Sequence, residues 1–179
     1  IMLSYLVLCN EEKYLPHVTD QYFNSDNFNN KAATVNIIAN TSDPLKDKVL
    51  HDFYEKWKNN KVVINQWIIA IVCSKNCTID TLEEIQSKDG FDPKNPNHLR
   101  SIYSAYTNNL GLYHDAEGKG YKYITDSIIK IAKFNPIIAD QLIKSAFMDY
   151  KKLPDAQKYL MKKELIRLKE DPELNSSIR

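Results

Sequence analysis

Apolar residues recur along this chain at the three- and four-residue spacing of amphipathic helices, and almost no segment alternates apolar and polar positions as a half-buried strand does. The clearest stripe starts at Leu45 and continues to Trp57. Asp43 in the N-cap position and Pro44 at the first helical position mark its start. This pattern predicts an all-α chain.

The same spacing, interrupted by turn residues, predicts the remaining helices. Residues 62–73 are apolar on nearly every side, which is expected of a central helix buried between neighbours. Thr78 is expected to cap the next helix, and residues 107–120 are predicted to form a polar, glycine-containing loop. The predicted helices cover residues 2–9, 15–24, 30–40, 44–57, 62–73, 79–86, 98–106, 121–133, 136–150 and 155–171.

Short connections between these helices favour antiparallel neighbours. We therefore expect helix pairs stacked into a curved superhelical array of the armadillo or HEAT kind. No repeat is legible at a fixed period, so the expectation rests on the order of the elements. The 179 residues, 43% of them apolar, are enough for one domain with its own core, and we treat 1–179 as a single all-helical domain.

Composition narrows the classes of partner. The 24 basic and 23 acidic residues leave a net charge of +1, with no segment basic enough to follow a nucleic-acid backbone. No apolar run reaches the roughly 18 residues that a membrane-spanning helix needs. Neither nucleic acid nor a membrane is expected as a partner.

Two further features concern the protein from which the chain comes and the compartment in which it is expected. Its apolar opening, residues 1–8, has neither the basic segment nor the cleavage site of a signal peptide, and we interpret it as a helix cut from a longer protein. Three cysteines do not form a disulfide framework, which fits a reducing compartment such as the cytoplasm.

The sequence contains no motif that is typical of a metal-binding site. There is no HExxH motif, and none of the four histidines has another within a helical turn. Cys73 and Cys77 stand four residues apart without a nearby third ligand. We predict that Cys73 is a small buried residue at the end of its helix and that Cys77 lies in the loop beyond.

Taken by themselves, the residues describe a helical array and little chemistry. Such arrays bind peptides or proteins on a concave surface, so a free-standing helical adaptor is one hypothesis for the function.

Four stretches in order resemble the C-terminal domain of the M1 family of zinc aminopeptidases, the alanyl or neutral aminopeptidases of bacteria and protozoa. They are HDFYEKWKNNKVVINQW (51–67), NPNHLRSIYSAYTNN (95–109), YHDAEGKGY (113–121) and FNPIIADQL (134–142). The resemblance implies a four-domain parent enzyme, in which a β domain, a thermolysin-like catalytic domain and a small β sandwich precede this helical domain.

In that family the HExxH motif and the distal glutamate ligand belong to the catalytic domain. The resemblance therefore implies zinc in the parent enzyme, no cofactor in this chain, and no catalysis by this chain alone. It implies two partners, the catalytic domain of the same polypeptide and short peptide substrates. The helical domain would close over the active site and leave an internal cavity.

The resemblance also places three residues in that cavity. Ile137 occupies the position that reaches the pocket for the first side chain of the substrate, where the bacterial enzyme has a polar residue and protozoan relatives have methionine. A shorter, more apolar pocket is the consequence, suited to alanine, leucine or methionine. Gln141 replaces an arginine of the bacterial enzyme, and Arg100 keeps the arginine of the NPN segment.

Two of these positions also have a simpler interpretation. Ile137 could be a core residue at a helix start, and Arg100 a surface salt-bridge partner. The adaptor hypothesis is separated from the peptidase hypothesis by one observation, whether the reading frame upstream of residue 1 encodes HExxH and a second glutamate ligand.

Overall fold

The computed structural model describes residues 2–172 and 174, and within these residues it contains helices and no strand. The predicted all-α class is therefore confirmed. The elements are α1 (Met2–Cys9), α2 (Glu11–Asn24), α3 (Phe28–Ile38), α4 (Leu45–Trp57), α5 (Ile64–Val72), α6 (Ile79–Ser87), α7 (Pro96–Asn108), α8 (Leu110–Tyr113), α9 (Lys119–Ala132), α10 (Pro136–Ala146), the 3-10 turn η1 (Tyr150–Lys152) and α11 (Asp155–Glu170).

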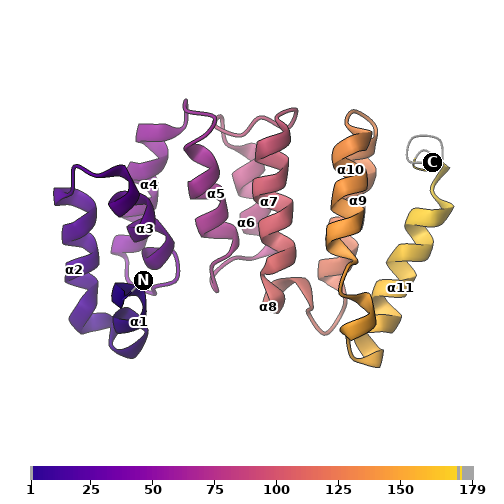
Figure 1. Cartoon of the computed structure of the whole chain (residues 1–179), viewed down its shortest axis with the longest axis horizontal. Helices are drawn as coiled ribbons and strands as arrows, with labels where there is room; N and C mark the ends of the chain where they lie inside the picture. Colours follow the sequence, from indigo (N-terminus) through magenta and orange to yellow (C-terminus); the bar gives the residue numbers. More distant parts are fainter. Residues whose placement is uncertain (1, 173, 175–179) are drawn as a thin grey trace.

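The helices stand in an elongated row, with the N-terminal helices at one end and α11 at the other (Figure 1). One layer is continuous, because α3 packs against α5, α5 against α7 and α7 against α10. Partner helices cover this layer: α4 contacts α3 and α5, and α9 contacts α10 and α11. The predicted stacked helical array is confirmed.

Buried aromatic and branched side chains fill the space between the layers. The stripe predicted on α4 faces inward, with Val49, Phe53 and Tyr54 buried. The predicted central helix, α5, buries residues on nearly every side. The largest fully buried side chains extend along most of the row: Tyr22, Ile38, Phe53, Ile64, Ile68, Leu82, Ile85, Ile102, Tyr106, Tyr121, Ile124 and Ile128.

Of the two predicted capping side chains, Thr78 is confirmed as the N-cap of its helix and Asp43 is not. The Thr78 hydroxyl accepts a hydrogen bond from the Thr81 amide at 3.2 Å, and the two threonines form a reciprocal capping box at the start of α6. Asp43 accepts from the Leu45 amide at 2.8 Å. Helix α4 nevertheless begins at Leu45, one residue after the predicted start, so Pro44 and not Asp43 is in the N-cap position.

The N-terminal boundary of α2 was predicted too late. The helix begins at Glu11 and contains Pro16, because the Asn10 side chain caps it by accepting from the Lys13 amide at 3.0 Å. Pro16 is exposed, so its ring and the missing hydrogen bond are accommodated on the solvent side of the helix.

The predicted loop 107–120 contains the short helix α8, and one carboxylate organises the turn between α8 and α9. Asp115 accepts hydrogen bonds from the amides of Glu117 at 2.9 Å and Gly120 at 2.6 Å. The predicted starts of α3, α7 and α9 are each two residues late, and α10 ends at Ala146 and not at residue 150. The carbonyl of Ala146 accepts from the Tyr113 hydroxyl at 2.6 Å, in place of the helical bond that would continue α10.

Cys77 lies in the loop after α5, as predicted, but the prediction that Cys73 is buried was wrong. Cys73 is exposed and Cys77 is buried. Helix α5 ends one residue before Cys73, and in the subsequent turn it is Ser74 that faces inward. Cys77 then returns to the core just before α6 starts, where burial raises the pKa of its thiol to about 11.

A substitution at Gly120 tests how closely α8 approaches α9. A Cβ at this position would lie 2.2 Å from the Tyr113 carbonyl oxygen, so Gly120→Ala should lower the free energy of unfolding by about 2–3 kcal/mol. Gly111, in α8, is the control because nothing lies within 4 Å of its Cβ position. Gly111→Ala should stabilise the chain by about 0.5–1 kcal/mol. Urea unfolding measures both, and equal effects would contradict the predicted contact.

Candidate functional site on α7 and α10

The structure brings two of the three sequence-predicted site residues into direct contact. The guanidinium of Arg100, on α7, donates to the Gln141 side-chain oxygen, on α10, from Nε at 3.3 Å and from Nη2 at 3.1 Å. Nη1 of Arg100 also donates to Asn97 Oδ1 at 3.3 Å. Both Arg100 and Gln141 are exposed. Because α7 and α10 pack together, this contact bridges two adjacent helices of the continuous layer.

Ile137 lies beside this contact, and its interpretation as a core residue is wrong. Its side chain is 72% exposed. It precedes Gln141 by four residues, so the two side chains lie on one face of α10. Asn135 sets this geometry by capping α10, accepting from the Ile138 amide at 3.1 Å, with Pro136 at the first helical position. We refer to Asn97, Arg100, Ile137 and Gln141 as the α7–α10 strip.

The Arg100 guanidinium is hydrogen-bonded to neutral side chains. Its hydrogen-bond partners are the amide oxygens of Asn97 and Gln141, and the salt bridges within residues 2–172 and 174 do not include it. A neighbouring carboxylate would neutralise the guanidinium, whereas amide oxygens orient it and leave its positive charge intact. The strip therefore combines an exposed cation with an exposed apolar side chain.

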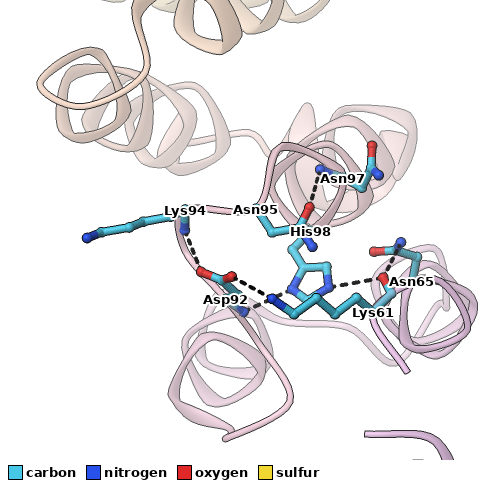
Figure 2. A network of polar contacts seen from close by, with 7 residues as sticks. All are labelled: Lys61, Asn65, Asp92, Lys94, Asn95, Asn97 and His98. Atoms are coloured by element: carbon cyan, nitrogen blue, oxygen red, sulfur yellow. Dashed lines mark hydrogen bonds and ion pairs between the residues drawn. The ribbon is translucent and has the colours of Figure 1, made fainter. Parts of the chain in front are cut away.

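A buried histidine holds the first turn of α7 in place (Figure 2). His98 is 1% exposed, and its Nδ1 lies 2.9 Å from the Asp92 amide, which donates to it. Because Nδ1 accepts, it carries no proton, and the neutral ring has its proton on Nε2. Nε2 lies 3.2 Å from the Lys61 carbonyl oxygen and donates to it. One ring thus joins α7 to the segment before α5 and to the segment after α6.

Further polar contacts extend this network to α5. The Asn65 amide nitrogen donates to the same Lys61 carbonyl at 3.1 Å, and Asn65 Oδ1 accepts from the Ser101 hydroxyl at 2.9 Å. Figure 2 shows Asn65 and His98 converging on this carbonyl. The start of α5 and the start of α7 are therefore fixed relative to each other by side chains from both helices.

Two short-range hydrogen bonds, one in the turn at Asp92 and one at the N-cap Asn95, order the segment that leads into α7. Asp92 Oδ1 accepts from the Lys94 amide at 2.9 Å, and its other oxygen faces the Lys61 ammonium at 3.5 Å; these two contacts hold the pKa of the Asp92 carboxyl below its ordinary value. Asn95 caps α7 by accepting from the Asn97 amide at 2.9 Å. The Asn95 cap thus fixes the backbone of Asn97. The side chain of Asn97 can then accept the hydrogen bond from Arg100.

Sequence reasoning missed the two residues that position Arg100. His98 was considered only as one of four histidines that could bind a metal, and Asn97 lay outside the helix predicted for residues 98–106, whereas α7 begins at Pro96. The signal that could have found them was the NPN sequence itself, because an N-cap asparagine followed by proline fixes the start of a helix and thus which side chains occupy its first turn.

The described residues provide neither a metal centre nor a membrane span. Within 2–172 and 174, no group of three or more histidine, cysteine, aspartate or glutamate side chains could hold a metal ion. No helix in this part of the chain is long and apolar enough to cross a bilayer.

Comparison with known proteins supplies the context for the strip. A family model described as "Domain of unknown function (DUF3458_C) ARM repeats" matches residues 1–179. Aminopeptidase N of Haemophilus influenzae is 27% identical over 170 residues, which are 94% of this chain and 19% of that protein. Aminopeptidase N of Caulobacter vibrioides is 32% identical over 141 residues, 74% of this chain and 16% of that protein. The chain thus spans less than a fifth of the length of either relative.

A solved structure has the same fold. The crystal structure of Legionella pneumophila aminopeptidase A in complex with aspartic acid superposes with a TM-score of 0.87 at 21% identity. The match covers 98% of this chain and 21% of that chain. The whole helical array, and not one repeat of it, is therefore shared with a part of a larger protein.

Removal of the His98 ring should destabilise the fold. His98→Leu leaves the Asp92 amide and the Lys61 carbonyl without this partner in a buried site, and we expect it to lower the free energy of unfolding by about 2–4 kcal/mol. His51 is the control, because it is exposed on α4, and His51→Leu should change stability by less than about 0.5 kcal/mol. Denaturant unfolding compares the two variants, and a similar small effect for both would refute the structural role of His98.

Proposed function

Because the chain belongs to the DUF3458_C family of ARM-repeat domains, the C-terminal helical domain of M1 aminopeptidases, we propose that its parent protein is a zinc aminopeptidase. The parent removes single N-terminal residues from short peptides. This domain covers the active site, shapes the internal cavity and contributes to the first substrate subsite. The observation that carries the proposal is the exposed α7–α10 strip on a chain matched over its full length by that family.

Chemistry at the metal belongs to another part of the parent. Zinc, when bound there, activates water for attack on the first peptide carbonyl. The proposed contribution of this chain's own residues is to substrate access and binding. A helical cover that excludes bulk water strengthens the electrostatic interactions inside the cavity.

Ile137 is suited to contact the first side chain of the substrate. Ile137 is 72% exposed in this domain and presents most of its apolar surface outward from the start of α10. Contact with alanine, leucine or methionine side chains buries apolar area on both partners, whereas an arginine side chain gains nothing at its charged end. The subsite should therefore favour small and medium apolar residues.

Arg100 is suited to attract the negative groups of a peptide. Its charge is oriented by Asn97 and Gln141 but not neutralised by them. A free peptide carboxylate that approaches the strip finds a guanidinium with N–H groups still able to donate. Gln141 orients Arg100 but is itself neutral. Arg100 therefore carries the single positive charge of the α7–α10 strip.

The parent enzyme with Ile137→Gln should change its substrate preference. We expect the ratio of kcat/KM for leucine over arginine amides to fall about tenfold, because an apolar contact to the substrate is replaced by a polar one. Met148→Gln is a matched control, since Met148 is 73% exposed but lies beyond the opposite end of α10. An unchanged ranking of alanine, leucine and arginine substrates in Ile137→Gln would remove this residue from the subsite.

Arg100→Gln should act on peptides and not on simple amides. The KM of a tripeptide with a free carboxylate should rise about 5- to 10-fold, while that of its C-terminally amidated form should change little. Lys144→Gln is the control, because the Lys144 ammonium is paired with Asp140 at 2.6 Å. Equal KM values for both peptides in Arg100→Gln would show that Arg100 does not contact the carboxylate.

A further inference from the structure

A cleft of about 380 Å³ opens between α4 and α6, next to the central helix α5. Its volume falls within the range of about 300–1,000 Å³ that is typical of pockets for small molecules. It shares no residue with the α7–α10 strip. We refer to it as the α4–α6 cleft, and its lining includes Lys46, Leu50, Tyr54, Ile71, Ser74 and Glu84.

Hydrogen bonds between neighbouring segments fix both ends of the cleft. At one end Asn76 Nδ2, just before α6, donates to the Ala39 carbonyl oxygen, just after α3, at 3.0 Å. At the other end the Tyr54 hydroxyl on α4 donates to Asp89 and accepts from the Gly90 amide at 3.0 Å, both beyond α6. The cleft is therefore preorganised, which lowers the cost of binding a ligand in it.

The floor of the cleft is apolar. Leu50 and Ile71 are half-buried and line the floor together with the buried ring of Trp67. The Trp67 indole N–H already donates to the Leu50 carbonyl oxygen at 2.9 Å, so the indole has no donor left for a ligand. A ligand that fills this part of the cleft is stabilised by burial of apolar surface and therefore carries an apolar group.

A buried serine interrupts this apolar floor. Ser74 is 2% exposed and lines the cleft. Its amide donates to the Ile71 carbonyl and its own carbonyl accepts from Asn109 Nδ2 at 3.0 Å, which fixes its backbone. Its hydroxyl has no hydrogen-bond partner within residues 2–172 and 174. Because buried hydroxyls in proteins normally have a partner, this one indicates a polar group of a ligand.

The rim of the cleft carries charges of both signs. In the first turn of α4, Lys46 is half-buried and Asp47 is exposed, and neither forms an ion pair in the part of the chain that the structure describes. Ser74 lies at the same end of the cleft, because Asn76, two residues further on, contacts the segment before α4. An unpaired cation, an unpaired anion and a free hydroxyl thus surround one end of the apolar floor.

We infer that the α4–α6 cleft binds a free amino acid with a large apolar side chain, such as leucine or phenylalanine. The side chain packs on the apolar floor. The carboxylate accepts from the Lys46 ammonium and the Ser74 hydroxyl, and the ammonium group of the ligand donates to Asp47. Because the proposed reaction releases single amino acids, the ligand belongs to the class of its products. That link rests on the proposed function, whereas the cleft itself does not.

Photolabelling locates the bound amino acid. The native full-length protein is irradiated with a diazirine analogue of leucine, and mass spectrometry of peptides identifies the labelled segments. We expect label within residues 39–88, and about tenfold less of it when L-leucine is present in large excess. Glycine lacks the apolar side chain, 3-methylbutylamine lacks the carboxylate and 4-methylpentanoate lacks the ammonium group, so none of these should compete as well as leucine. Label in other segments only would overturn the inference.

Two variants test the polar contacts. Ser74→Ala removes a hydroxyl without a partner, so it should not lower the free energy of unfolding but should raise the leucine concentration needed for competition about fivefold. Lys46→Gln should raise this concentration about tenfold. Lys48→Gln is the matched control, because Lys48 is exposed on α4 and does not line the cleft. Equal competition by leucine in all three variants and in the unaltered protein would overturn the inference.

Hydrolysis of an alanine amide by the same preparation separates this inference from the proposed function. Label in the cleft that leucine displaces, in a protein that does not hydrolyse the amide, would support the binding site and refute the aminopeptidase activity. Hydrolysis without such label in the cleft would refute the binding site alone.

Discussion

In a row of helices, each member can bury its apolar surface only against its immediate neighbours. The continuous layer α3, α5, α7 and α10 meets this constraint because each helix packs on the next, and α4 and α9 of the other layer cover α3, α5 and α10. Position along the row then decides how many sides of a helix are covered. Helix α5, in the middle, buries residues on nearly every side, whereas α11 buries only Met161 and Leu168.

The site depends on this packing. Helix α7 lies between α5 and α10, so its first turn is fixed on one side by the buried His98 network and contributes Arg100 to the contact with Gln141 on the other. A neutral histidine that both accepts and donates satisfies two backbone groups without burying a charge. The orientation of Arg100 therefore depends on buried contacts that involve the neighbouring segments before α5 and after α6.

The sequence was sufficient to predict the described α-helices other than the short α8, because periodicity and capping residues are local signals. The capping threonine at position 78, the stripe on α4 and the buried character of α5 all depend on residues close together in the chain. The features that local pattern did not reveal depend on distant partners. The end of α10 at Ala146 involves a hydroxyl from Tyr113, and the inward turn of Cys77 depends on the path of the chain into α6. Likewise, the exposure of Ile137 contradicts what its hydrophobicity suggests, and only the family resemblance pointed to it.

The candidate site separates the residues that maintain the fold from those that are exposed at its surface. His98, Asn65 and Ser101 are joined by hydrogen bonds in the interior of the α5–α7 contact, so replacement there leaves unsatisfied polar groups. Ile137 and Gln141 instead project from α10 after its start has been fixed by Asn135 and Pro136. Exposed positions on a helix whose cap is intact change stability little when substituted. The two strip positions on α10 can therefore vary in size and charge while the array that carries them stays the same, which is the property that a specificity surface on a shared fold requires.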